Sequence, residues 1–254
     1  MPSSKNTNSN LTHQEQTEKF HFDELADNYD NNYGYKGKFF EYKKNKKLKR
    51  LKNLVRNKKM KLLEIGCGTG EYTRDIISFS MQNNITAVDI SKNILKIAKN
   101  KCKSKQVKFI QASVYKLPFK DNSFDLICGF YIAHHLDLKQ MFIELSRVLK
   151  TEGVIYLVEP NILNPIVYLI KNISYLKNMV GDSPGEYAIN PISINSFLDN
   201  NLQVQNIEYT EYLPPTKLLR DELLIKFDKV VSLINKVPVL KFLGGSVILE
   251  ISKK

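Results

Sequence analysis

The sequence contains no long apolar run, no apolar segment near its start and few cysteines. No stretch of about 18 uninterrupted apolar residues occurs, which argues against a membrane-spanning helix. Residues 1–10 are polar and lack the apolar centre of a secretory signal, so we expect a disordered tail over residues 1–18. The cysteines, Cys67, Cys102 and Cys128, are odd in number and show no metal-ligand spacing. This pattern favours reduced thiols, a cytoplasmic location and no bound metal.

Acidic residues are nearly missing from one segment, and this segment carries the net charge of the chain. The chain has a formal net charge of +12, and residues 36–61 contain 13 lysines and arginines against a single acid, Glu41. Apolar residues recur there at roughly helical spacing, which predicts a helix with its lysines on the solvent side. These apolar residues are Phe40, Leu48, Leu51, Leu54 and Val55.

Three interpretations of the basic helix stay open. It is a solvated helix on the sheet edge, a surface for anionic lipid or an anionic substrate, or an RNA-binding element. The sequence lacks a glycine-aromatic RNA-binding signature, which argues against nucleic acid as a partner.

The most informative feature of the chain is a short apolar run that ends in glycine at every second position. Gly66, Gly68 and Gly70 follow this run and precede a segment of helical pattern. Glycine lets the backbone turn sharply and approach a ligand, and the following helix points free N–H groups at it. A structural turn or a nicotinamide-dinucleotide site, with its G-x-G-x-x-G pattern, is the alternative. Glu64, two residues before the first glycine, would repel a pyrophosphate and so disfavours the dinucleotide.

Further strand-like segments follow in order. Residues 85–89, 107–110 and 123–128 are short apolar runs separated by segments of helical pattern. The alternation predicts a parallel nucleoside-binding sheet, and Asp89 falls where such folds hold the two hydroxyls of a ribose. A length of 254 residues with 43% hydrophobic content is enough for one well-buried α/β core.

Four motifs in order resemble a known family. They are residues 64–70 (EIGCGTG), 88–91 (VDIS), 117–125 (LPFKDNSFD) and 144–153 (ELSRVLKTEG). Together they resemble the class I S-adenosylmethionine (SAM) methyltransferases, in the subgroup of small-molecule and lipid enzymes similar to those of quinone biosynthesis. The resemblance covers residues 20–160 well and the C-terminal third loosely. It implies a doubly wound, mostly parallel seven-stranded sheet (Rossmann-like) with helical cap insertions, and S-adenosyl-L-methionine as the cofactor.

The resemblance also implies which residues bind the cofactor. Glu64 would serve the charged methionine end of SAM, and Asp89 the ribose. In relatives the third strand ends in Gly-Asp-Ala, and Ser113 stands here in place of the aspartate that accepts a hydrogen bond from the adenine amino group. The Ser113 hydroxyl or the backbone N–H of Val114 would then meet the ring. The full predicted set is Tyr29, Glu64, Gly66, Cys67, Gly68, Gly70, Asp89, Ile90, Ala112, Ser113, Val114 and Phe130.

An N-terminal lid is also implied. Residues 22–30 resemble the F-D-x-x-A-x-x-Y-D element that precedes the core in this family, where the tyrosine closes over the cofactor, so Tyr29 is a predicted lid residue. An ordinary amphipathic helix with Tyr29 on its buried stripe explains the same spacing, and the two interpretations are compatible. We expect the lid and basic helix over residues 19–60 and the methyltransferase core over residues 61–254.

The fourth strand delivers residues 128–136 to the ligand-binding edge of the sheet. Enzymes that methylate exocyclic amines share an (Asn/Asp)-Pro-Pro-(Tyr/Phe) tetrapeptide at this position, and this segment lacks it. The segment also lacks the Pro-Cys dipeptide of enzymes that methylate C5 of cytosine. For an acceptor hydroxyl, His134 is the best available base, because the unperturbed pKa of histidine lies near neutrality. The alternative is a positioning role at a helix start or pocket wall. By the resemblance, the adjacent His135 is expected to pack away.

Two apolar insertions are expected to cap the site, at about residues 160–190 and 210–245. Strands near 203–209 and 246–251 would complete the sheet as an antiparallel pair. Helices this apolar must bury both sides, and core packing is the leading expectation, with a dimer or lipid as alternatives.

These features predict a SAM-dependent methyltransferase that acts on a small, hydrophobic or lipid-linked acceptor. Peripheral membrane contact is expected through residues 36–61 or through the apolar cap. The alternative function is a membrane- or RNA-associated binding protein that keeps the fold but has little turnover. The acceptor atom and the oligomeric state stay open.

Overall fold

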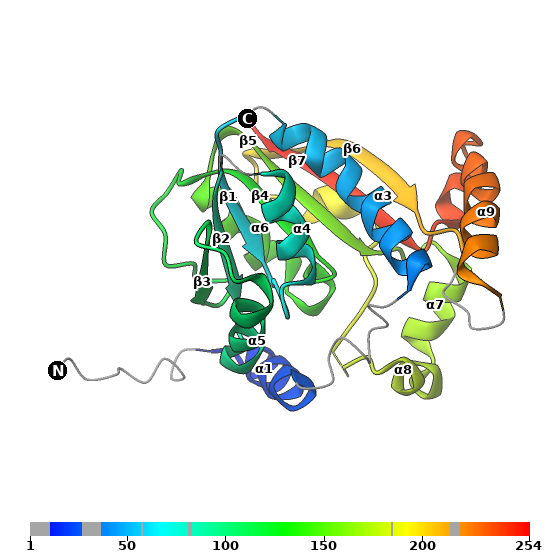
Figure 1. Cartoon of the computed structure of the whole chain (residues 1–254), viewed down its shortest axis with the longest axis horizontal. Coiled ribbons are helices and arrows are strands. Elements are labelled where there is room, and N and C mark those ends of the chain that lie inside the picture. Colours follow the sequence, from blue (N-terminus) through cyan, green and yellow to red (C-terminus); the bar gives the residue numbers. More distant parts are fainter. Residues whose placement is uncertain (1–10, 27–36, 57, 81–82, 184, 214–218) are drawn as a thin grey trace.

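A computed structural model describes residues 11–26, 37–56, 58–80, 83–183, 185–213 and 219–254. These residues are built around a seven-stranded sheet of strand order β3-β2-β1-β4-β5-β7-β6 (Figure 1). The strands are β1 (Lys61–Ile65), β2 (Asn84–Asp89), β3 (Val107–Gln111), β4 (Phe124–Phe130), β5 (Leu149–Pro160), β6 (Leu202–Thr210) and β7 (Ser246–Lys253). Strands β1 to β5 form the parallel part of the sheet, and β7 pairs antiparallel with both β5 and β6. The predicted fold class is confirmed.

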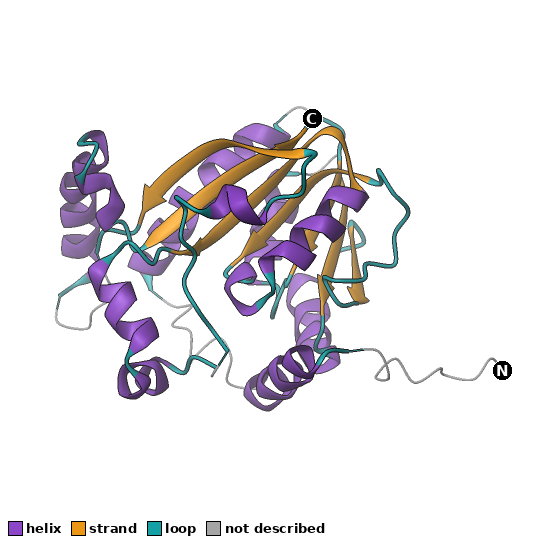
Figure 2. Ribbon diagram, turned by 180° about the vertical axis from the view of Figure 1, so that it is seen from behind, coloured by secondary structure: helices purple, strands orange, loops and turns teal. Residues whose placement is uncertain are grey.

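Helices cover both faces of the sheet (Figure 2). They are α1 (His13–Leu25), α3 (Lys38–Val55), α4 (Glu71–Phe79), α5 (Lys92–Cys102), α6 (Leu138–Val148), α7 (Pro165–Asn172), α8 (Ser174–Val180) and α9 (Asp221–Val231). Short 3-10 helices are η3 (Ala133–His135), η4 (Ile194–Phe197), η5 (Ser232–Lys236) and η6 (Leu240–Leu243). The three cysteines are unpaired.

The central strands are apolar in continuous runs because both of their faces are buried. Side chains alternate between the faces, so Leu63 and Ile65 of β1 join the core with Phe142 of α6. Leu62 joins the other core, with Leu51 of α3. Strand β1 pairs with β2 on one side and β4 on the other, so the chain leaves the centre in both directions. The carboxyl ends at such a switch point form the crevice in which open α/β sheets bind ligands.

The N-terminal helix begins earlier than the sequence analysis predicted. The N–H of Glu15 donates to the Thr12 hydroxyl at 3.2 Å, and the N–H of Thr12 donates to the Glu15 carboxylate at 2.8 Å. This reciprocal capping box starts α1 at His13, so the expectation of a disordered tail over residues 1–18 is wrong for its last six residues. The predicted lid residue Tyr29 lies outside the described residues.

Helix α3 confirms the predicted apolar stripe and contradicts the predicted solvent face. Leu48, Leu51 and Val55 are buried, as expected. However, the side chains of Lys44 and Lys47 are also buried, at 0% and 2% exposed. These lysines turn inward because carboxylates from other elements pair with them.

Each of the four inward lysines of α3 has an acidic partner. Lys44 Nζ lies 2.6 Å from Glu71 Oε1 and 2.9 Å from Asp75 Oδ2, both on α4. Lys43 and Lys47 each lie 3.1 Å from Glu211 Oε1, at the end of β6, and Lys46 lies 2.7 Å from Asp228 of α9. Much of the charge of the basic helix is therefore neutralised inside the fold.

The two apolar insertions form helices that are poorly covered. Each expected helical run is broken, the first into α7 and α8 and the second into α9 followed by η5. Neither α7 nor α8 contains a buried residue, so the expectation that core packing covers these helices is wrong. Helices α7, α8 and α9 lie together at one end of the molecule, opposite β3, in both views (Figures 1 and 2). Among the described residues, no helix has the length and apolar character needed to cross a bilayer.

Candidate active site

The glycine loop turns the chain sharply between β1 and α4. Gly66 and Gly68 have φ values of +59° and +52°, in the left-handed region that side chains disfavour. A Cβ atom on Gly66 would lie 2.5 Å from Cγ1 of Ile132, so the chain behind the loop leaves no room for one. Gly70 is the N-terminal cap of α4, which begins at Glu71.

Asp89 ties this loop to the end of β2. The N–H of Gly68 donates to Asp89 Oδ2 at 2.9 Å, and the N–H of Ser91 donates to Oδ1 at 2.9 Å. Burial raises the pKa of Asp89, and the two backbone N–H groups oppose that rise. The carboxylate is therefore fixed in direction at the edge where two strands end.

A pocket of about 720 Å³, here called the first pocket, lies at the carboxyl edge of the sheet. It collects predicted residues from four different strand ends. The predicted residues that line it are Gly66, Gly68, Asp89, Ile90, Ala112, Val114 and Phe130.

A smaller pocket of about 280 Å³, here called the loop pocket, adjoins the first and is lined by Glu64 and Cys67. Gly66, Gly68 and Phe130 line both pockets. Burial raises the pKa of Glu64 to about 8, and its Oε2 atom has no hydrogen-bond partner among the described residues. A buried carboxyl group with an unpaired oxygen suits a cationic group of the ligand, because such a group would supply the missing partner.

Ser113 is placed differently from the prediction. Its hydroxyl donates to Glu15 of α1 and accepts the N–H of Tyr115 at 3.1 Å, and Ser113 is not among the residues that line the first pocket. Glu15 does line the pocket, so the carboxylate at this end comes from α1. The local pattern Thr12-x-x-Glu15 indicates a helix start, but a contact with a residue 98 positions away leaves no local signal.

Helix α1 forms one wall of the first pocket. Gln14, Glu15, Glu18 and Phe22 all line it. Residues 22–30, the predicted lid element, contribute Phe22 to this wall, and the other three described residues lie earlier in α1.

His134 and Glu159 form a buried pair where η3 meets the end of β5. His134 Nδ1 lies 2.7 Å from Glu159 Oε2, and the N–H groups of Ile132 and Ala133 donate to Glu159 Oε1 at 3.1 and 2.8 Å. Burial raises the pKa of Glu159 to about 7 and lowers the pKa of His134 well below its usual value. When Glu159 is ionised, Nδ1 carries the hydrogen and Nε2 carries the lone pair.

A second pocket, of about 840 Å³, contains this histidine. It shares Phe22, Tyr131 and His135 with the first pocket, so the two lie side by side. The second pocket is lined by Phe22, Phe40, Lys43, Lys47, Tyr72, Tyr131, His134, His135, Pro160, Lys171, Asp182, Glu186 and Glu211. The expectation that His135 packs away is wrong, because it lines both pockets.

Tyr131 is held in a strained conformation between the two pockets. Its φ value is +57°, uncommon for a residue with a side chain. Its hydroxyl accepts from Lys47 at 2.9 Å and donates to Glu211 at 2.6 Å. Two lysines of α3 therefore reach the site through Glu211, which sequence spacing did not reveal.

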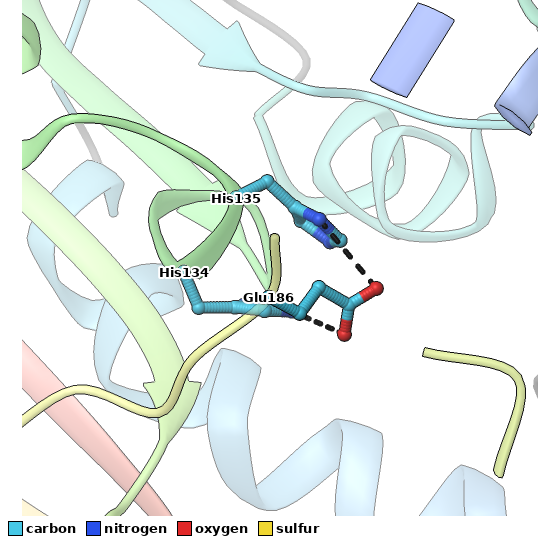
Figure 3. Close-up of side chains that lie close together, drawn as sticks. All are labelled: His134, His135 and Glu186. Atoms are coloured by element: carbon cyan, nitrogen blue, oxygen red, sulfur yellow. Dashed lines mark ion pairs between the residues drawn. The ribbon is translucent and has the colours of Figure 1, made fainter. Parts of the chain in front are cut away.

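Figure 3 shows a cluster of two histidines and a glutamate, which residue spacing in the sequence did not predict. His134, His135 and Glu186 each offer one possible metal-ligand atom, and these atoms lie within 4.8 Å of one another. The ammonium of Lys171 lies 2.8 Å from Glu186 Oε2 and 2.6 Å from Asp182. This lysine already brings positive charge to the carboxylates that a divalent cation would use.

Comparison with known proteins identifies the domain. Residues 63–157 match the family model of the methyltransferase domain. This chain carries a methyltransferase domain. The recognition of class I SAM-dependent methyltransferases from four sequence motifs is confirmed.

Curated relatives match the methyltransferase domain and its surroundings. An uncharacterised protein of Methanocaldococcus jannaschii is 37% identical over 160 residues, covering 61% of this chain and 56% of the relative. A demethylmenaquinone methyltransferase of Staphylococcus aureus is 34% identical over 112 residues, covering 43% of this chain and 46% of the relative. The chain thus spans about half the length of the curated relatives it matches. The second relative supports the predicted resemblance to quinone-biosynthesis enzymes.

Solved structures share the fold at low identity. A SAM-dependent methyltransferase of Thermotoga maritima, described as a possible histamine N-methyltransferase, superposes with a TM-score of 0.65 at 15% identity. The match covers 92% of this chain and 99% of that one. The likeness therefore extends well beyond residues 63–157.

SAM is the cofactor of this family, and the residues of the site fit it. Asp89 lies where the ribose hydroxyls are expected, and the unpaired Oε2 atom of Glu64 offers a partner for the ammonium of the methionine end. The glycine loop between them lets the backbone approach a ligand closely. The assignment of single residues to parts of SAM stays a prediction.

Proposed function

We propose that this protein transfers a methyl group from SAM to a hydroxyl of a small, hydrophobic or lipid-linked acceptor bound in the second pocket. The observation that carries the proposal is the pair His134–Glu159: His134 lines the second pocket and is adjacent in sequence to His135, which lines both pockets. The proposal gives His134 the catalytic role that was predicted from its sequence position.

The chemistry divides between the cofactor and the protein. Bound SAM supplies a methyl group that is electrophilic because its sulfur is a sulfonium. The protein positions the acceptor oxygen in line with that methyl group and removes the hydroxyl proton. Ionised Glu159 accepts the Nδ1 hydrogen of His134, which leaves Nε2 to take the proton. The acceptor would leave with an O–CH₃ bond in place of the O–H bond whose proton His134 takes, and breaking of the S–CH₃ bond would give S-adenosylhomocysteine.

The lining of the second pocket indicates the class of acceptor. Its aromatic members, Phe22, Phe40 and Tyr72, suit an apolar or aromatic body. Its lysines are already paired, Lys43 with Glu211 and Lys171 with Glu186. This balance supports a neutral headgroup in preference to a strongly anionic one, because an anion would have to compete with carboxylates that are already in place.

A lipid-linked acceptor is also supported by the exposed apolar cap beside the site. The relative from Staphylococcus aureus acts on demethylmenaquinone according to its name, and we propose an acceptor of similar apolar character for this chain. An acceptor of this kind would be presented at a membrane surface.

Labelled methyl transfer tests the proposal. The purified protein is first examined by mass spectrometry for carried-over SAM or S-adenosylhomocysteine, and then incubated with methyl-labelled SAM and fractionated cell extract. We expect label in the organic-solvent fraction as a base-stable ether. Asp89→Ala and His134→Gln variants serve as controls and should lose the signal. Label in RNA, in protein or in no fraction contradicts the proposal, and the last result together with retained SAM binding would favour a binding protein of this fold.

A further inference from the structure

The apolar side chains that solvent reaches are concentrated at one end of the molecule. Among the described residues, 20 large hydrophobic side chains are exposed, and 16 of them come from residues 165–180 and 219–243. We call these two segments together the cap surface. The most exposed members are Val239 at 74%, Tyr175 at 72% and Met179 at 68%. Apolar patches of this extent mark interaction sites on natural proteins.

Helix α9 has the pattern of a helix that lies in an interface. Leu223, Phe227 and Val230 recur at i, i+4 and i+7, so they form one exposed stripe. Leu224 and Asp228 on the inner side are buried. The stripe is therefore free to meet an external apolar phase while the opposite side holds the helix to the domain.

Charge on the cap surface favours an anionic partner. Two of its three acids pair with lysines of α3: Glu222 with Lys38 and Asp228 with Lys46, both at 2.7 Å. The third, Asp221, accepts the backbone N–H of Phe39. Lys226 of α9 is exposed beside the apolar stripe. Lysines at such positions extend their stems along the apolar phase and place the ammonium among headgroups.

The shape of the surface favours a fluid partner. On α7, Ile166, Tyr168 and Leu169 are exposed, and at 100° per residue they point over a wide arc of the helix circumference. The remainder of the apolar surface stands on a different element, α9 with η5 and η6. Lipid chains can surround projecting side chains that point in several directions, whereas the flat patch of a second copy would cover only some of them.

The second pocket opens beside this surface. Lys171 of α7 and Asp182, just after α8, line the pocket, and so do Phe40 and Lys43 of α3. Helix α3 in turn packs against α9. The pocket mouth is thus bounded by the same elements that carry the cap surface.

We propose that the cap surface docks on an anionic lipid bilayer and holds the mouth of the second pocket against the membrane. The apolar side chains of α7, α8, α9 and η5–η6 enter the interfacial region, and exposed lysines contact headgroups. The docking itself is independent of catalysis. With its mouth at the membrane, the second pocket would receive the acceptor from the bilayer, and this part of the inference alone rests on the proposed function.

Vesicle flotation tests the docking without any methyl transfer. Full-length protein is mixed with vesicles of phosphatidylcholine containing about 30% phosphatidylserine, or of phosphatidylcholine alone, at low salt. We expect co-flotation with the anionic vesicles. The quadruple variant Tyr175→Ser, Met179→Ser, Phe227→Ser, Val239→Ser should bind at least tenfold more weakly. These side chains are more than half exposed, so the variant is expected to fold.

Matched controls use apolar residues and lysines away from the cap surface. Phe20→Ser with Ile143→Ser removes side chains of similar exposure from α1 and α6 and should leave flotation unchanged. The double variant Lys226→Glu, Lys229→Glu should bind the anionic vesicles more weakly and with a smaller dependence on salt. The double variant Lys49→Glu, Lys52→Glu on α3 should bind them as the parent does. Equal flotation of the parent and the cap variant, or none by the parent, overturns the proposal.

Sedimentation and calorimetry separate the remaining outcomes. A parent dimer that the quadruple cap variant converts to a monomer, with no flotation by either, would overturn the proposal and assign the cap surface to a second copy. S-adenosylhomocysteine affinity should be the same in the cap variant and the parent. Vesicle binding without any methyl transfer would contradict the proposed function and leave the docking surface standing.

Discussion

The imidazole of His134 and the carboxylate of Glu159 lie 2.7 Å apart, with Glu159 completely buried. Backbone N–H groups of Ile132 and Ala133 also point at this carboxylate. The β5 strand end thereby fixes the position of a histidine on the adjacent 3-10 helix and, when Glu159 is ionised, its tautomer. A histidine held in this way presents its lone pair at Nε2 and not at Nδ1.

Replacing His134 by glutamine should lower kcat by about 10²- to 10⁴-fold, the usual contribution of a positioned general base. SAM affinity, measured by calorimetry, should stay the same, because His134 lines neither the first pocket nor the loop pocket, where the predicted cofactor contacts lie. Glu159→Gln should lower kcat with little change in KM, since it alters the orientation and basicity of the imidazole. His13→Gln, on the exposed side of α1, is the control. A fully active His134→Gln protein would assign this histidine a structural role only.

Chelation should leave methyl transfer unchanged. The cluster of His134, His135 and Glu186 has metal-like spacing, but the ammonium of Lys171 lies 2.8 Å from Glu186 and would repel a divalent cation. Protein treated with EDTA and desalted should retain its rate in the labelled-methyl assay. A rate that falls and is restored by Zn²⁺ or Mg²⁺, with metal detected by mass spectrometry, would show instead that this cluster holds an ion.

SAM binding should release a proton at pH 7. Burial raises the pKa of Glu64 to about 8, so its carboxyl group is mainly protonated in the free protein at neutral pH. The ammonium of bound SAM favours the ionised form, which means that affinity should increase with pH and level off above about 8. Calorimetry at pH 7 in two buffers of different ionisation enthalpy measures the proton released.

The Glu64→Gln variant is the control for this linkage. It should show no proton release and a flat pH dependence of affinity. The folded-state pKa of Glu64 lies above the unfolded one, so its contribution to stability is present at pH below about 4.5 and is lost as pH rises towards 8. The unfolding free energy of Glu64→Gln relative to the parent should therefore rise across this interval. Equal proton release by both proteins would exclude Glu64 as the source.

Two carboxylates should contribute to cofactor affinity to different extents. Asp89→Ala removes the predicted acceptor for both ribose hydroxyls, so calorimetry should show SAM binding weakened by about 2 to 3 kcal/mol. Glu15→Gln changes the carboxylate that lines the first pocket beside Ser113, the predicted adenine contact, and should weaken binding by about 1 kcal/mol, as for a single hydrogen bond. Asp89→Asn, which can still accept the N–H of Gly68, checks that the loss is not caused by loop disorder. Unchanged affinity in folded Asp89→Ala would contradict the ribose assignment.

Local sequence patterns predicted the parts of the site that local physics determines. The strands, the left-handed Gly66 and Gly68 and the position of Asp89 follow from apolar runs and turn chemistry within a few residues. His134 was found because the end of β4 must meet the ligand-binding edge. These features depend on short segments whose conformations are nearly independent of the remainder of the chain.

Contacts between distant segments were not predictable from local patterns. Glu15 reaches Ser113, and Lys47 reaches Glu211, across 98 and 164 positions. Helical spacing shows which residues share a face, but it does not show whether a neighbouring element carries carboxylates. For this reason the lysines of α3 were expected in solvent, and the apolar residues of the cap were expected in the core.

The inward lysines of α3 lead to the last prediction, which separates buried from solvated charge. Lys44 is completely buried between Glu71 and Asp75, and although burial alone would lower its pKa, these carboxylates raise it. Lys44→Met keeps the apolar stem but removes the buried ammonium from Asp75 and from Glu71, which retains Arg74 and Lys101 as partners, so urea unfolding should show a loss of about 1 to 3 kcal/mol. Lys49→Met, on the exposed side of the same helix, should change stability by less than about 0.5 kcal/mol. Equal stabilities of the two variants would place Lys44 in solvent and restore the expectation of a solvated basic helix.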